Sequence, residues 1–485
     1  MSGLVLVGCI VTLWFGERIG VNGGQGWDGM SYTQWAQDFW RKVVVDGLTA
    51  FHSQRVVSSA VVHYGLRILG LRTDVPHVIA GFQALNTIAL VGSAVLWAQL
   101  SRAMSWPRPA AWVGFVGLFG GYANARHALY YPTLTDPTAF ALGMMMAWAY
   151  LTRRGWALWL VAGLGGFTWP SLAPLAIGVL VFPRRTGGEP PPERTRARGI
   201  AAAVISGTAA VVFVVVALHF MAHPLRGVGD EKFAAWVRGD LLPLTVALLL
   251  AMLGLGGYLL LNQPVLWNLR NYLRQLDRRR TMLAVASVAV LLVARALWLR
   301  NVGWRQGPTI VQFMCEHTLS AIRGPLWGPV YSVVYFGPIV LIALMYWRRI
   351  AAVCADWGPS AVLAMAMTLG FAAAANTRQW NHLLPFLVTA TVAATSTLWN
   401  TRRLVVFTLL SVAWSKVWLT IGYDVPDNWL RFPNQRYFMN YGPYASDATY
   451  LPHLIATVVS FVILAIALRR ADVRLVSPAN AVRPT

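Results

Sequence analysis

Long apolar segments recur along the whole chain, and they restrict the possible folds more than any other feature. A helix needs about 20 consecutive apolar residues to cross the hydrocarbon of a bilayer. Segments of roughly this kind lie at 2–16, 77–99, 109–123, 137–152, 156–168, 170–182, 200–222, 241–261, 281–299, 328–346, 357–375, 383–399, 404–422 and 452–468. They predict an all-α, polytopic transmembrane bundle of about 12–14 spans, in which the short pair 156–168 and 170–182 forms a re-entrant hairpin.

The composition excludes the main classes of soluble protein. Charged residues make up only 12% of the chain, whereas soluble globular proteins have about 25%. A cytosolic enzyme and a disordered chain are therefore both excluded. The three cysteines, Cys9, Cys315 and Cys354, are scattered and show neither metal-ligand spacing nor a disulfide pattern.

The positive charge predicts the orientation of the chain. The 40 Lys and Arg residues exceed the 18 acids and give a net charge of +22, which on a soluble protein would suggest nucleic acid. Here most of the excess lies in alternate loops between the spans. Loops rich in Lys and Arg stay in the cytoplasm, so we expect both termini to be cytoplasmic and no nucleic-acid partner.

The chain reads as a single integral-membrane domain over 1–485, and four segments between the spans stand out. They are the long first outer loop 17–76, the cytoplasmic loop 183–199, the basic segment 262–280 and the late outer loop 423–451. Segment 262–280 is predicted to be amphipathic and to lie on anionic membrane lipids. The outer loops hold dense groups of acids, histidines and aromatic residues, so we expect the functional site on that side.

The first outer loop contains a candidate catalytic carboxylate. Asp28 lies among glycines, which let a backbone approach an incoming group closely. A carboxylate there can act as a general base, hold a metal ion, or cap the helix that follows, and these interpretations stay open. His52 and Arg55 follow later in the same loop.

A second polar group lies at 124–137 and ends in Asp136 at the mouth of a span. It also contains Arg126, His127, Tyr130 and Tyr131. Asp136 is either a helix cap or, beside these partners at membrane depth, part of a polar cavity.

The remaining candidates lie late in the chain. Arg378 can bind phosphate through two parallel hydrogen bonds or, with Trp380, anchor the chain at the interface. Lys416 lies inside a span near the outer surface, where it can reach a lipid phosphate. Arg436 and Asn440 belong to an aromatic and amide-rich stretch that suits sugar rings.

These groups, in this order, resemble bacterial integral-membrane glycosyltransferases of the GT-C superfamily. Gly26–Tyr32 is similar to the Tyr-Asp-Gly-Gln-Phe-Tyr-Tyr type of segment in the first outer loop of many such enzymes. The other similar segments are His52…Arg55…Tyr64-Gly65, Asn124–Asp136 and Arg378…Leu384-Pro385.

The resemblance implies an activity and a role for each candidate. Such enzymes move a sugar from a polyprenyl-phosphate donor to an envelope glycan, glycolipid or protein acceptor, on the periplasmic side of the inner membrane. Asp28 would be the catalytic base, with Asp136 as the second carboxylate. Candidate ligands of the donor phosphate are Arg55, Arg126, Arg378 and Lys416. Candidate substrate contacts are His52, His127, Tyr130, Tyr131, Trp380, Arg436 and Asn440.

The chain departs from the resemblance in two ways: Met30 and Ser31 replace the usual Gln and Phe, and a second acid is missing. Many members of the superfamily pair two acids near the first-loop aspartate and bind a divalent metal there, whereas Asp28 has no adjacent acid. A Mg²⁺ or Mn²⁺ cofactor is therefore doubtful, and cationic side chains are the substitute that we expect. The alternative function is a transporter or flippase of a lipid-linked or anionic substrate. The absence of a visible repeat and the clustering of polar residues at one face count against that alternative.

Overall fold

The computed structural model describes residues 1–49, 51–185, 195–225, 234–267, 278–298, 310–421, 442, 445 and 447–472. These residues form helices and no strand, which confirms the all-α prediction for this part of the chain. Arg436 and Asn440 lie outside the described residues, as do most of segment 262–280 and most of the loops 183–199 and 423–451.

Several helices have the length and composition of membrane spans. Four in the described residues are long and apolar enough to cross a bilayer: α4 (Val75–Ala103), α10 (Arg196–Ala222), the stretch Gly239–Leu261 that contains α12 (Leu242–Leu261), and Thr449–Arg469 within α22 (Asp447–Asp472). Shorter apolar helices are α1 (Ser2–Phe15), α8 (Gly155–Gly165), α9 (Leu172–Val181), α19 (Pro359–Ala373) and the segment Leu384–Leu398 that begins with α20 (Leu384–Thr395). The full count of 12–14 spans stays a prediction.

The outer surfaces of the long helices are apolar. Ile200, Val204, Val211 and Val215 of α10 are all exposed. Contiguous exposed apolar surface is rare on soluble monomers, whereas in a bilayer it faces lipid tails.

The remaining α-helices are α2 (Asp28–Gln37), α3 (Val57–Ile68), α5 (Arg108–Phe119), α6 (Ala128–Tyr130), α7 (Asp136–Thr152), α14 (Arg278–Trp298), α15 (Ile310–Ala321), α16 (Trp327–Phe336), α17 (Ile339–Met345), α18 (Trp347–Trp357) and α21 (Thr401–Ser415).

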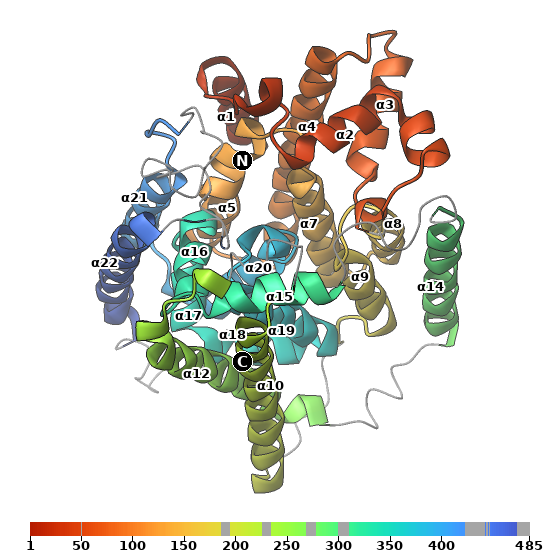
Figure 1. Cartoon of the computed structure of the whole chain (residues 1–485). Helices are drawn as coiled ribbons and strands as arrows, with labels where there is room; N and C mark the ends of the chain where they lie inside the picture. The colour runs from red at the N-terminus through yellow and green to blue at the C-terminus, as the bar shows by residue number, and fades with distance from the viewer. Residues whose placement is uncertain are drawn as a thin grey trace, which may run out of the picture.

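The helix α7 lies at the centre of the part of the bundle that holds the candidate site. It packs against α4, α8 and α20, and most of its side chains are buried (Figure 1). Gly143 in the middle of α7 lies so close to the chain after α19 that a Cβ there would come within 2.0 Å of the His382 carbonyl oxygen. This close approach fixes segment 376–382 beside the N-terminal half of α7.

The first loop is folded against the same end of the bundle. Within it, α2 and α3 pack on each other and on α4, and Figure 1 shows both near one end of α4. Ser59 Oγ of α3 donates to the Tyr32 carbonyl of α2 at 3.0 Å. Asp28, at the start of α2, is therefore held at the end of the bundle where α7 begins.

The pair α8 and α9 forms a short helical hairpin beside α7. The two helices pack on each other, and α14 packs against α9. With 11 and 10 residues, each is about 16 Å long, which is shorter than the roughly 30 Å of bilayer hydrocarbon. This length suits the re-entrant arrangement that the sequence predicts.

Candidate functional site

Three segments far apart in the sequence meet at one guanidinium. Arg378, in the short helical turn Thr377–Trp380, donates from Nε to Asp136 Oδ1 and from Nη2 to Asp136 Oδ2, both at 3.0 Å. Its Nη1 lies 3.7 Å from Asp28 Oδ2. Two parallel hydrogen bonds of this kind give strong and directional pairing. The residues that sequence analysis selected as the two acids and one of the phosphate ligands therefore form one cluster.

The two carboxylates differ in their exposure. The Asp136 side chain is only 3% exposed, whereas that of Asp28 is 51% exposed. Both are the first residue of their helices, and the cap positions belong to Trp27 and Thr135, which make no side-chain cap. The helix-cap alternative therefore receives no support at either residue. Asp28 is the carboxylate that an incoming molecule can reach.

Arg55 lies buried near this cluster with part of its hydrogen-bonding capacity unused. Its guanidinium carbon stands 4.3 Å from the ring centre of Phe51 and 4.6 Å from that of Trp169, and Nη1 donates to the Tyr32 hydroxyl at 3.4 Å. In the described part of the chain, Nε and Nη2 have no hydrogen-bond partner. Unpaired buried donors are costly, and an oxyanion would satisfy both of them.

The histidines of the site are neutral at ordinary pH. Burial lowers the pKa of His52, and the nearby Arg55 lowers it further, while Asp28 acts in the opposite direction. Burial likewise lowers the pKa of His127 to about 3, although Asp136 partly opposes the shift. His127 Nδ1 shares a hydrogen bond with the Tyr335 hydroxyl at 3.3 Å. These imidazoles are thus hydrogen-bonding groups rather than cations.

The glycines around Asp28 approach the protein's own residues. A Cβ on Gly26 would lie 2.2 Å from the Tyr131 ring, and one on Gly29 would lie 2.0 Å from Thr133 Oγ1. The Gly29 N–H also donates to the Tyr131 hydroxyl at 3.3 Å. The small residues therefore let the start of α2 dock on segment 131–133, a role different from the close approach to an incoming group that sequence analysis suggested.

Arg126 and Lys416 belong to a second cluster. Arg126 pairs with the Glu17 carboxylate and donates to the carbonyls of Lys416 and Leu419, the latter at 2.5 Å. Lys416 Nζ lies 3.2 Å from His453 Nε2. This cluster joins the chain after α1 to the end of α21. Both side chains have partners there, Arg126 in Glu17 and Lys416 in His453.

Two further candidates are enclosed by protein. Tyr130 and Trp380 are 2% and 0% exposed. The Trp380 ring centre lies 4.1 Å from that of Phe336. Both side chains are therefore packed inside the protein. In the residues that the structure describes, no three or more His, Cys, Asp or Glu residues are grouped to hold a metal ion, and the position between Asp28 and Asp136 is taken by Arg378.

An apolar crevice of about 420 Å³ lies next to the chain segment that leads into Arg55. Ser53 and Gln54, which directly precede Arg55, form one part of its wall. The rest is apolar and comes mainly from the α8–α9 hairpin and α14: Gly166, Phe167, Pro170, Ala173, Pro174, Ile177, Val288, Leu291 and Leu292. Arg55 itself does not line the crevice, which is therefore an apolar surface next to the segment that carries this buried cation.

No family model, curated protein or solved structure matches this chain.

Sequence analysis missed two of those residues. Trp169 is the ring against which Arg55 stacks, and its Nε1 donates to the Gln379 carbonyl at 3.1 Å. Tyr32, the hydroxyl partner of Arg55, was noted only as part of the Gly26–Tyr32 segment. Trp169 lies in the short Trp-Pro link between two spans, and that position was the available signal.

Proposed function

We propose that this chain is a membrane glycosyltransferase that moves a sugar from a polyprenyl-phosphate donor to an envelope glycan, glycolipid or protein acceptor. The observation that supports it most directly is the convergence of Asp28, Asp136 and Arg378 from segments about 100 and 240 residues apart. The active site faces the periplasm in a bacterial inner membrane, and both termini are cytoplasmic.

The proposed reaction is one direct displacement at the anomeric carbon. The acceptor hydroxyl gives its proton to Asp28 while its oxygen forms the new bond to that carbon. The bond from the carbon to the phosphate oxygen breaks, and its electron pair leaves with the polyprenyl phosphate. The phosphate thereby changes from a monoanionic diester to a dianionic monoester, so a fixed cation beside it stabilises the transition state.

Arg55 supplies that cation. Its unpaired Nε and Nη2 are the donors that best match a phosphate oxygen pair. Arg378 is a positioning residue, because its two hydrogen bonds to Asp136 and its ion pair with Asp28 hold the two acids together at the start of α7. In this proposal the apolar crevice lined by Ser53 and Gln54 takes the first isoprene units of the donor, and the phosphate binds at Arg55, the next residue in the chain.

The test measures transfer by purified full-length protein in lipid nanodiscs with a panel of radiolabelled polyprenyl-phosphate sugars. We expect donor hydrolysis or transfer with one donor, and loss of at least 100-fold of the rate in Asp28→Asn, because a positioned general base contributes about 10²–10⁴-fold. The matched control is Asp38→Asn, at the exposed C-terminal end of the same helix; it should keep the full rate.

If the chain is a transporter or flippase, the sugar should be moved without being transferred. It would move a labelled lipid-linked sugar across proteoliposome membranes without breaking the bond between sugar and phosphate. Movement of the labelled lipid-linked sugar without cleavage of its sugar–phosphate bond would refute the proposed mechanism. Full transfer activity in Asp28→Asn would refute it as well.

A further inference from the structure

A second pocket lies at the end of the bundle away from the Asp28–Arg378 cluster. Asp136 begins α7, whereas Ala149, Tyr150 and Arg153 at the other end of the helix line this pocket. Seventeen residues of helix separate the two ends by about 25 Å. The pocket has a volume of about 300 Å³ and also receives residues from α8, α9, the segment 183–185 and α14.

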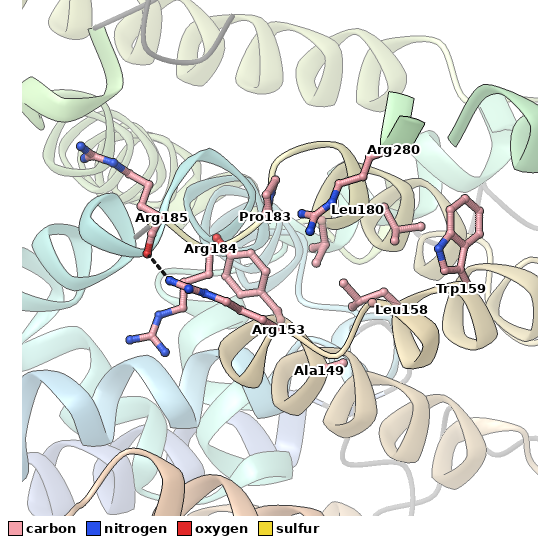
Figure 2. A pocket seen from close by; sticks show the side chains of 12 residues that line it. Ala149, Arg153, Leu158, Trp159, Leu180, Pro183, Arg184, Arg185 and Arg280 are labelled. Carbon is pink, nitrogen blue, oxygen red and sulfur yellow. Dashed lines mark hydrogen bonds between the residues drawn. The ribbon is translucent and has the colours of Figure 1, made fainter. Parts of the chain in front are cut away.

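Among the described residues that line the pocket, arginine is the only charged type. The four are Arg153, Arg184, Arg185 and Arg280. Figure 2 shows Arg153 and Arg280 on different sides of the pocket, with Arg280 reaching in from α14. Asp356 interacts with Arg185 but does not line the pocket. The wall therefore creates a positive potential that favours an anion.

Backbone contacts hold these arginines close together in spite of their repulsion. Arg153 Nη2 donates to the Arg185 carbonyl at 3.2 Å, the dashed line in Figure 2, and Arg184 Nη1 donates to the Leu151 carbonyl at 2.7 Å. The Trp357 carbonyl accepts from both the Tyr150 hydroxyl and the Arg185 N–H, at 2.8 and 3.0 Å. Burial and the neighbouring Arg153 lower the pKa of Arg184. An anion would relieve this crowding of like charges.

The other wall of the pocket is apolar and continues onto the outer surface of the bundle. Leu158 and Trp159 of α8 and Leu180 of α9 line it. On the neighbouring face of α8, Trp156, Leu160 and Leu164 are exposed at a spacing of four residues, which places them in one stripe along the helix. A ligand that fits both walls has an anionic head and an apolar tail.

We propose that this pocket binds the headgroup of an anionic phospholipid. The phosphate lies between Arg153 and Arg280, and an acyl chain runs along Trp159 and the exposed stripe of α8. In the predicted orientation the pocket lies at the cytoplasmic leaflet, where anionic lipids attract basic segments. The proposal needs only a membrane-embedded chain and is independent of the transferase activity.

The test measures how ligands raise the unfolding temperature of full-length protein in an uncharged detergent, because a ligand that binds only the folded state stabilises it. Three ligands are compared: dioctanoyl phosphatidylglycerol, the zwitterionic dioctanoyl phosphatidylcholine, and inorganic phosphate. We expect phosphatidylglycerol to be effective at a concentration at least tenfold lower than either of the other two.

Variants locate the site. Arg153→Gln and Arg280→Gln should each raise the phosphatidylglycerol concentration for half-maximal effect about tenfold, the loss expected for one charge-assisted contact. Arg402→Gln removes the same charge from an exposed position outside the pocket and should change nothing. The single variants are used because each removes only one exposed arginine and leaves the core intact.

Three outcomes would overturn the proposal. Equal potency of inorganic phosphate would identify a soluble anion as the ligand, and equal potency of phosphatidylcholine would exclude recognition of the headgroup charge. A response of both pocket variants equal to that of Arg402→Gln would place the lipid elsewhere.

Discussion

Replacement of Arg378 by glutamine tests whether the buried ion pair organises the candidate site. Arg378 makes two 3.0 Å hydrogen bonds to Asp136, whose side chain is 3% exposed. The variant Arg378→Gln leaves that carboxylate buried without its cation. Breaking a buried pair by removing one partner costs about 3–5 kcal/mol, so we expect the free energy of unfolding to fall by about that amount.

A double-mutant cycle separates the pairing from other effects of the substitution. Asp136→Asn alone leaves Arg378 with Asp28, 3.7 Å from its Nη1, and should cost less than Arg378→Gln. The double variant removes both charges together, so its loss should be smaller than the sum of the single losses by about 1–3 kcal/mol. The measurement is reversible unfolding in mixed micelles of increasing denaturing-detergent content.

The control for the cycle is Arg67→Gln, at an exposed position of α3. It should change the free energy of unfolding by no more than about 0.5 kcal/mol, as surface substitutions do. Two results would refute the reasoning: a loss in Arg378→Gln no larger than in Arg67→Gln, or additive losses in the cycle.

Two further predictions concern the surroundings of the cluster. Gly29→Ala should lower the free energy of unfolding by about 1–3 kcal/mol, since the added Cβ would lie 2.0 Å from Thr133 Oγ1. A second substitution, Thr133→Ala, should restore part of the lost stability. If it restores none, the predicted contact is wrong. His127 has a pKa of about 3 in the folded chain against an ordinary 6.5, so the unfolded chain binds its proton first as the pH falls. The contribution of the neutral imidazole to the free energy of unfolding is complete above pH 6.5 and is lost towards pH 3, at about 1.4 kcal/mol per pH unit. In His127→Gln the free energy of unfolding should therefore change less steeply with pH, by that amount. An unchanged slope would show that His127 is not buried as a neutral imidazole.

The chemistry-bearing residues were partly predictable because polar residues are rare in this chain. In a sequence with 12% charged residues, a carboxylate such as Asp136 at the mouth of a span is conspicuous, and so is Arg378 before another. Burying such a group in a membrane protein is costly, so each of them implies a partner. The sequence contains no signal for which partner each one meets.

The packing of the helices decided which partner each of these polar residues meets. Arg378 pairs with Asp136, while Arg126, an equally plausible phosphate ligand in sequence terms, is engaged by Glu17 at the other cluster. The pairing of Arg378 with Asp136 depends on a close contact at a glycine, since Gly143 lets the His382 carbonyl lie directly beside α7. Contacts between such distant segments depend on how whole helices pack, and local patterns do not encode them.

The sequence by itself determined an all-α chain with spans of membrane length and a set of rare polar residues at their ends, because apolar length and charge scarcity are local properties. Only the tertiary structure decided that Asp28, Asp136 and Arg378 form one cluster, and that Trp169 and Tyr32 hold Arg55 near it. It also brought Arg153 and Arg280, 127 positions apart in the chain, to one pocket. The physical reason is that a side chain's partners are set by the packing of helices from distant parts of the chain.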